Sequence, residues 1–204
     1  TPKNREPYWD NIKKTVSTSG PWLISLCFLT YTLQWIAIMV WLPNFAIEER
    51  GLGLGLAASL AAAGVIVNIF GNLFGAWLVH RGVARWLMIT IGTCFMGGTS
   101  LLIFPDVLPD LIRFGFVLIF SFMGALQPTT LLAGVPVHTP SQDQLGATNG
   151  LLYQGSQIGL FFGPPVVALV VTFTGTWEFV GWFLFIGTVL NLAMAQGIRL
   201  LEKQ

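Results

Sequence analysis

Six long apolar runs constrain the fold of this chain more than any other feature of its sequence. They cover roughly residues 21–45, 57–79, 86–104, 111–134, 146–172 and 177–198. A helix needs about 20 apolar residues to cross the hydrocarbon core of a bilayer, which is about 30 Å thick. A helix also satisfies its own backbone hydrogen bonds, as lipid requires. We therefore predict an all-α integral membrane protein whose six transmembrane helices form one membrane domain over residues 21–198.

The composition supports the same class and excludes several others. Only 9% of the 204 residues are charged, 54% are hydrophobic, and the mean hydropathy is +0.72, whereas a soluble domain carries about 25% charged residues. The net charge of +1 gives no indication of a nucleic-acid partner. Cys27 and Cys94 lie inside apolar runs, which favours packing over a disulfide. The sequence holds no Cys/His cluster, so we predict neither a metal nor a cofactor.

Two polar segments flank the six runs. Residues 1–20 are predicted to be a cytoplasmic loop or a short amphipathic segment at the membrane surface, since Trp9, Ile12 and Val16 fall at helical spacing among basic residues. An unstructured linker is the alternative. Residues 199–204 are predicted to be a cytoplasmic tail. The chain begins at Thr1 and shows no signal peptide, so we expect a piece of a longer protein or a processed one.

The distribution of positive charge predicts the orientation in the membrane. Six spans place both ends of the chain and its second and fourth turns on one side. That side holds Lys3, Arg5, Lys13, Lys14, Arg81, Arg85, Arg199 and Lys203, whereas the other side holds Arg50 and Arg113. Cytoplasmic loops collect Lys and Arg. We therefore expect both termini to be cytoplasmic, in a plasma membrane such as the bacterial inner membrane.

The stretch Gly71–Trp86, GNLFGAWLVHRGVARW, contains the end of one run, a basic turn and the start of the next run. Gly71 and Gly75 share a helix face, which allows a neighbouring helix to approach closely. The turn that follows cannot lie in lipid, because it gathers charge around a glycine. Its residues are His80, Arg81, Gly82 and Arg85.

Uncharged polar side chains are the main candidates for function inside the runs, because no Asp, Glu, Lys or His lies deep in one of them. The candidates are Tyr31, Gln34, Asn68, Asn72, Gln127, Asn149, Tyr153 and Gln157. The last three follow one another at four-residue intervals and form a stripe on one face. An amide in hydrocarbon needs a partner. The partner is either a neighbouring helix, or a small polar or anionic solute in a water-filled cavity.

Other residues carry weaker indications. Arg113 is expected to reach the outer interface, with a position facing an anion in a cavity as the alternative. His80 and His138 lie in predicted loops, and no Ser–His pair lies within the membrane, so we predict that the protein is not an enzyme. In the fifth run, close packing followed by a hinge is predicted from a glycine repeat and two prolines. These residues are Gly155, Gly159, Gly163, Pro164 and Pro165.

Three stretches of the chain resemble the C-terminal six-helix half of a major facilitator superfamily transporter of the cyanate, drug or organic-anion permease type. They are WLPNFAIEERGLGLGLAASL, GNLFGAWLVHRGVARWL and TPSQDQLGATNGLLYQGSQIGLFFGPP. The second is similar to the superfamily's cytoplasmic loop motif, which runs Gly, three residues, Asp, Arg, any residue, Gly and then basic residues. Gly75, Gly82 and Arg85 match that motif, whereas Val79 replaces the Asp and His80 replaces the Arg.

The resemblance implies a twelve-helix carrier made of two halves, each built from two inverted three-helix repeats. This chain would supply the C-terminal half, its partner would be the N-terminal six-helix half, and a small solute would cross the bilayer by alternating access. Gln34 and Gln127 would line the cavity, Asn68 and Gln157 would flank it, and residues 75–85 would form a gating loop. Two alternatives remain: a half-size protein that homodimerises as a transporter, and a structural membrane subunit without transport activity.

Overall fold

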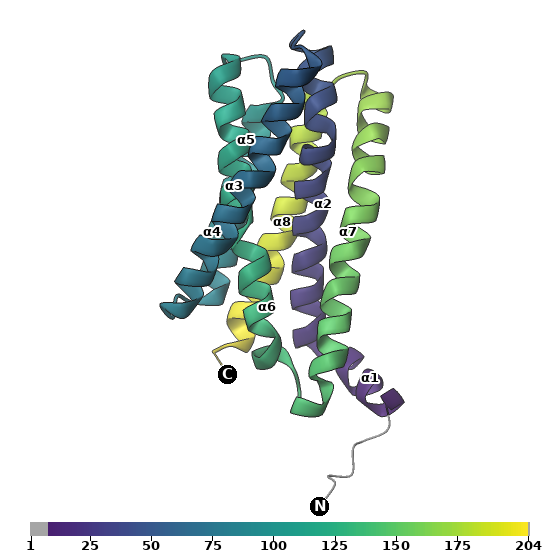
Figure 1. Ribbon diagram of the computed structural model, residues 1–204. Coiled ribbons are helices and arrows are strands. Elements are labelled where there is room, and N and C mark those ends of the chain that lie inside the picture. The colour runs from purple at the N-terminus through teal and green to yellow at the C-terminus, as the bar shows by residue number, and fades with distance from the viewer. Residues whose placement is uncertain (1–7, 204) are drawn as a thin grey trace, which may run out of the picture.

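The computed structural model describes residues 8–203, and every regular element in that range is a helix (Figure 1). Lys3, Arg5 and the rest of residues 1–7 lie outside the described residues, as does Gln204. Six helical stretches are long and apolar enough to cross a membrane, which confirms the predicted class. They are α2 (Ser19–Glu48), α3 (Leu54–His80), α4 (Arg85–Ile103), the pair α5 (Asp110–Gly124) and α6 (Leu126–His138), the 3₁₀ turn η1 (Gln142–Gln144) with α7 (Leu145–Thr174), and α8 (Glu178–Leu201).

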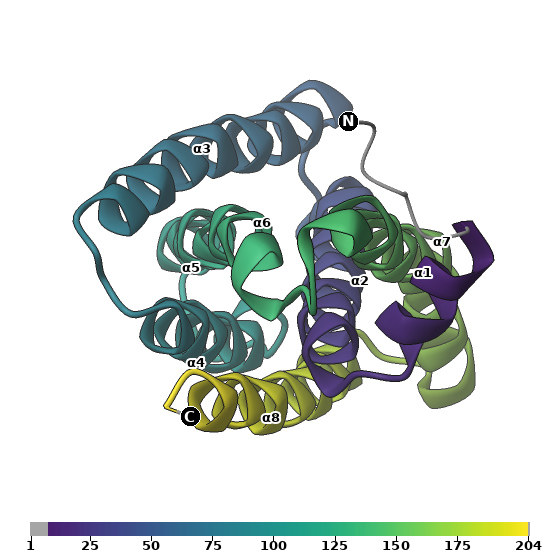
Figure 2. The same cartoon turned by 90° about the horizontal axis from the view of Figure 1, so that it is seen from below.

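The six spans form two sets of three in chain order, α2 to α4 and α5 to α8, and each span of the first set packs against spans of the second. α7 packs along α2, α3 packs along α5 and α6, and α4 packs along α8. α2 and the α5–α6 pair, the first spans of the two sets, run in opposite directions (Figure 1). α2 and α6 lie between α3 on one side and α8 on the other (Figure 2). This is the arrangement of two inverted three-helix repeats.

The fourth span is interrupted near its middle, which the sequence analysis did not predict. α5 ends at Gly124 and α6 begins at Leu126. Pro128 lacks the N–H that would bond to the Gly124 carbonyl group, and its ring would crowd that same group. The break therefore falls where the proline removes the helical hydrogen bond.

Other prolines do not end their helices. α2 continues past Pro43 to Glu48. α7 continues through Pro164 and Pro165 as far as Thr174. Membrane helices tolerate proline where neighbouring helices satisfy the freed backbone groups. At the same level of the bundle, the Trp41 side chain of α2 donates from Nε1 to the Pro164 carbonyl oxygen at 2.9 Å, which joins α2 to α7.

Glycines set the distance between the paired helices. Gly155, Gly159 and Gly163 of α7 all face α2, where a Cβ at Gly163 would lie only 2.7 Å from the Leu33 carbonyl oxygen. Gly71 of α3 similarly faces the backbone of α5. A larger residue at any of these positions would separate the helices, because backbone atoms cannot move aside as a flexible side chain does.

Ion pairs join the turns at each end of the bundle. At one end Arg50 Nη1 lies 2.7 Å from Asp106 Oδ1, which connects the first and third turns. At the opposite end Arg85 Nε lies 2.6 Å from Glu202 Oε1, and His138 Nε2 lies 3.3 Å from the same oxygen. The second and fourth turns therefore share one end with the C-terminus, as six alternating spans require.

Arg113 is buried, and its guanidinium lies against the third turn at one end of the bundle. Its side chain is fully enclosed, and Nη1 donates to the carbonyl oxygens of Ile103 at 3.0 Å and Phe104 at 3.1 Å, while Nη2 donates to that of Leu108 at 3.0 Å. The last carbonyl groups of a helix have no partners within it and favour a positive charge. Arg113 therefore caps the end of α4, and its guanidinium also faces two carboxylates of the same end, with Nη2 at 3.5 Å from Asp106 Oδ1 and Nε at 3.6 Å from Asp110 Oδ1.

The helix α1 (Tyr8–Val16) lies at the same end as the C-terminus and packs against α2, α7 and η1 (Figure 1). Trp22 at the start of α2 donates from Nε1 to the Val16 carbonyl oxygen at 2.9 Å. Trp9 and Lys13 lie on its exposed surface. Part of the predicted surface segment is therefore helical.

Candidate functional site

The polar residues that the sequence analysis selected in the spans fall into three groups. The first, which we call the amide cluster, surrounds Asn191 of α8. Asn191 Nδ2 donates to the Cys27 carbonyl oxygen at 3.1 Å, to Thr30 Oγ1 at 2.7 Å and to Gln127 Oε1 at 3.0 Å, and its Oδ1 accepts from Thr93 Oγ1 at 3.2 Å. One side chain of α8 thus connects to α2, α4 and α6.

Gln34 belongs to the same cluster. Its Oε1 accepts from Thr188 Oγ1 of α8 at 3.1 Å, and its Nε2 donates to the Thr30 carbonyl oxygen at 3.0 Å. Gln34, Gln127 and Asn191 are all fully buried. The structure therefore places both glutamines inside this half, between its helices, and their hydrogen bonds are made there.

The sequence analysis did not select Asn191. The available signal was an amide alone among apolar neighbours in the last run, at a position where hydrocarbon offers it no partner. Its companions Thr30, Thr93 and Thr188 gave no comparable signal, since a hydroxyl can bond to its own helix.

The second group, the α3 cluster, joins α2, α3, α5 and α6. Asn68 Nδ2 donates to the Tyr31 hydroxyl at 3.3 Å and to the Ser121 carbonyl oxygen at 2.9 Å. Asn72 Nδ2 donates to Asn68 Oδ1 at 3.0 Å, and Asn72 Oδ1 accepts from Thr129 Oγ1 at 3.1 Å. Both asparagines remain partly exposed, whereas Tyr31 is buried. This group forms a chain of amides that ends at the surface of α3.

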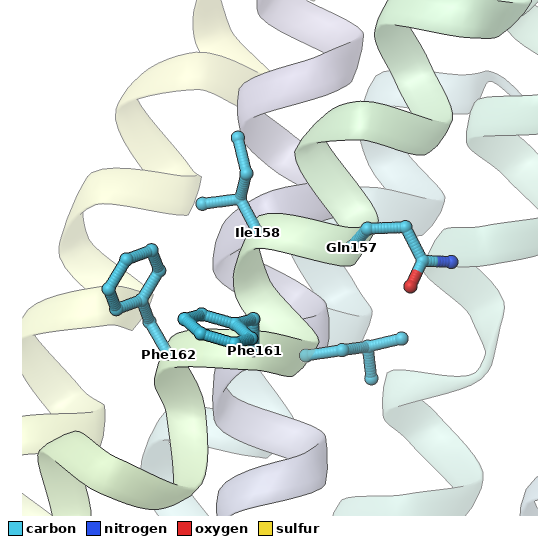
Figure 3. Close-up of a pocket in the computed structure, with 5 residues that line it drawn as sticks. Gln157, Ile158, Phe161 and Phe162 are labelled. Carbon is cyan, nitrogen blue, oxygen red and sulfur yellow. The ribbon is translucent and has the colours of Figure 1, made fainter.

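The third group, the α7 stripe, consists of Asn149, Tyr153 and Gln157. Asn149 Nδ2 donates to the carbonyl oxygen of Leu145 in its own helix at 3.2 Å. Tyr153 is 49% exposed, although its ring lies 6.4 Å from that of Phe28. Gln157 lines an open pocket of about 470 Å³ together with Ile158, Leu160, Phe161 and Phe162. Its amide extends from α7 away from Ile158 and Phe162 (Figure 3).

The exposure of the α7 stripe has a physical consequence. The helix is apolar enough to span a membrane, yet Gln157 and Tyr153 present polar atoms on its surface. An exposed amide in hydrocarbon costs several kcal/mol, on the order of 4–8 by transfer to an alkane. This face must therefore meet water or another protein segment and not lipid. The structure does not bring Gln157 to Gln34 and Gln127, so the three glutamines do not surround one cavity within this half.

The predicted gating loop separates into residues with different surroundings. Gly82 adopts a left-handed conformation, with φ +75°. The N–H of Gly82 bonds to the Val79 carbonyl oxygen at 2.9 Å, and that of Val83 bonds to Leu78 at 3.1 Å, which together form a Schellman cap of α3. Gly75 packs against α6, and Arg85 pairs with Glu202. His80 and Arg81 are exposed. Within residues 8–203, no group of His, Cys, Asp or Glu side chains could hold a metal ion.

The chain is similar in sequence to two curated proteins. It is 25% identical to the "Probable nitrate/nitrite antiporter NarK1" of Thermus thermophilus, over 91% of this chain and 45% of that protein. It is 26% identical to the "Nitrite extrusion protein" of Bacillus subtilis (strain 168), over 76% of this chain and 38% of that protein. The chain thus spans less than half the length of the curated relatives that it matches. No family model matches it.

Two solved structures share its fold. The Escherichia coli fucose:proton symporter FucP aligns with a TM-score of 0.76 at 15% identity, over 94% of this chain and 46% of that one. A structure of the major facilitator superfamily transporter FucP in the outward conformation aligns with a TM-score of 0.78 at 17% identity, over 96% and 47%. In both cases nearly all of this chain matches about half of a transporter. The chain is therefore a six-helix membrane protein with the fold of one half of a major facilitator superfamily transporter.

Proposed function

We propose that the chain supplies the C-terminal half of a secondary transporter that moves a small polar or anionic solute by alternating access. The fold and the share of each relative that is covered support a half carrier. The α7 stripe carries the proposal, because its exposed polar atoms need water or another protein segment beside them. An N-terminal six-helix half, packed across that face, would enclose an aqueous site.

The chemistry of the described residues favours a solute without positive charge. Every Asp and Glu in residues 8–203 lies in a turn or near the end of a helix, so the interior of these spans offers no carboxylate to a cation. The groups that it offers are amides and phenols, which donate hydrogen bonds to anions and polar solutes. The two curated relatives are named for nitrate and nitrite, which are small anions. We therefore propose solutes of that class. The candidate contacts are Tyr153 and Gln157 of the α7 stripe, with Asn68 and Asn72 of the α3 cluster.

Exchanging Gln157 for leucine in the full-length transporter tests the site. The Gln157→Leu variant is expected to bind nitrite or nitrate about tenfold to a hundredfold more weakly, because a lost hydrogen bond to a charged solute costs about 1–3 kcal/mol. Its thermal stability should be unchanged, since Gln157 makes no hydrogen bond within residues 8–203. Affinity is measured by concentration-dependent uptake into proteoliposomes, and stability by thermal unfolding in detergent.

The matched control is Gln34→Leu. Gln34 lies in the amide cluster, so its loss should lower the unfolding temperature and leave the affinity of the folded protein intact. Equal affinity in Gln157→Leu and the unchanged protein would contradict the proposed site. A weakened affinity in Gln34→Leu alone would place the solute beside the amide cluster instead.

We also propose that the end of the bundle with the C-terminus faces the cytoplasm. Six of the basic residues predicted to be cytoplasmic lie at that end among the described residues (Figure 1): Lys13, Lys14, Arg81, Arg85, Arg199 and Lys203. The two basic residues predicted on the opposite side, Arg50 and Arg113, lie at the other end. Cysteines introduced at the exposed positions Ala84 and Asp106, in a protein lacking Cys27 and Cys94, are expected to label differently with an impermeant maleimide. In intact cells Asp106→Cys should react and Ala84→Cys should not. The reverse pattern would invert the orientation.

A further inference from the structure

A ladder of aromatic rings leads from the end of α3 along its outer surface. The rings of Phe74 and Trp77 are stacked with centroids 5.7 Å apart, and those of Phe74 and Phe122 are stacked at the same distance. The guanidinium carbon of Arg81 lies 4.9 Å from the centre of the Trp77 ring. The rings of Trp77, Phe74 and Phe122 therefore form a continuous apolar strip, and the positively charged Arg81 lies at its end next to Trp77.

The ladder continues into a groove between α3, α4 and α5. We call it the α3 groove. It is open on the surface, has a volume of about 400 Å³ and is lined by apolar side chains, Val67, Phe95, Leu118, Ile119, Phe122 and Met123. Phe122 belongs to both features, so strip and groove form one surface. The side chains that line the groove offer no hydrogen bond, so an apolar group such as an acyl chain suits it better than a polar ligand.

The dimensions suit a lipid of one leaflet. Val67 precedes Arg81 by about 14 residues, which is about 21 Å along a helix. Half of the hydrocarbon core is about 15 Å, and the headgroup layer adds a few Å to it. With Arg81 at the membrane surface, the α3 groove lies near the middle of the bilayer, where an acyl chain ends.

The positive charge of Arg81, at the end of the strip, favours a lipid with an anionic headgroup. Arg81 is exposed, and none of the ion pairs recorded among residues 8–203 involves it. The preceding residue, His80, is exposed as well. A guanidinium with free donors binds phosphate, and Trp anchors at the headgroup level. We propose that one anionic phospholipid binds this surface, with its phosphate at Arg81 and one acyl chain along Phe74 and Phe122 into the α3 groove.

The proposal is tested with the full-length protein in detergent by titration with phosphatidylglycerol or phosphatidylcholine that carries brominated acyl chains. Bromine quenches nearby Trp fluorescence, and the difference between the unchanged protein and Trp77→Phe isolates the signal of Trp77. We expect phosphatidylglycerol to quench Trp77 at lower concentration than phosphatidylcholine. In Arg81→Gln this preference should fall about fivefold, from about 1 kcal/mol for one basic residue at an anionic surface.

Two matched variants separate the site from general lipid contact. Arg199→Gln removes a second Arg–Trp pair at the same end, where Arg199 lies 4.3 Å over the Trp86 ring away from the α3 groove, and it should leave the Trp77 signal unchanged. Val67→Phe should fill the α3 groove and weaken the binding of both lipids. Val65→Phe, at an exposed position outside the groove, should leave the binding of both unchanged. Equal quenching by the two lipids in the unchanged protein, or an equal loss in Arg81→Gln and Arg199→Gln, would overturn the proposal.

Discussion

Replacing Gly159 with leucine is expected to separate α7 from α2 and to lower the free energy of unfolding by more than about 3 kcal/mol. A single Cβ at this position would already overlap Thr32 and the backbone of Leu29, and would lie 2.9 Å from the Leu33 nitrogen. Overpacking a well-packed site costs about 1–3 kcal/mol where side chains can adjust, and more where backbone blocks them. The expected readout is a large fall in the yield of folded protein and in its unfolding temperature in detergent.

Gly98→Leu is the matched control for this prediction. Gly98 also lies in an apolar span, but no heavy atom stands within 4 Å of the Cβ that it would gain. The unfolding temperature of Gly98→Leu should stay close to that of the unchanged protein. If Gly159→Leu behaved in the same way, the close contact between α7 and α2 would not exist in the folded protein.

Asn191→Leu is expected to cause the second largest loss of stability, about 1–3 kcal/mol. The substitution keeps a similar volume but leaves the Gln127 side-chain oxygen Oε1 without a donor and the Thr93 hydroxyl without its acceptor. Polar contacts between membrane helices average about 0.6 kcal/mol each, so the loss of several at one side chain reaches this range. Chemical unfolding in detergent measures it.

The control is an asparagine whose amide bonds to its own helix. Asn149→Leu removes only the bond to Leu145, so its stability should change by less than about 0.5 kcal/mol. A double-mutant cycle adds a second check. Asn191→Leu and Gln127→Leu remove the same hydrogen bond, so their effects should not add. Additive losses would show that the two amides do not interact.

The break in the fourth span shows that the presence of a proline does not by itself decide whether a helix of this protein is interrupted. Pro43, Pro128 and Pro164 all lie in spans, yet only Pro128 coincides with a helix end. The loss of one N–H is the same at each position. The outcome therefore depends on how each segment packs against helices that are distant in sequence, as α7 packs along α2 at Pro164. The sequence alone therefore shows where the prolines lie but not which of them interrupts its helix.

The sequence by itself determined the class of the protein, the number of spans and the sharing of one end by the second turn and the C-terminus. Those properties follow from the length of each apolar run and from the exclusion of charge from hydrocarbon, which act on each segment separately. It also marked the amides and glycines that need an explanation, because each is costly or unusual in lipid.

Only the tertiary structure decided which amide meets which partner. A membrane span is apolar on every side, so no polar face indicates which way Gln34 or Gln157 points, and the i, i+4 spacing is the same for packing and for a cavity. Asn191 of α8 donates to the Gln127 side chain of α6, and Arg113 of α5 caps α4, because distant segments supply the atoms that complete their hydrogen bonds. Such partners are fixed by the packing of whole helices and cannot be deduced from the spacing of residues within one of them.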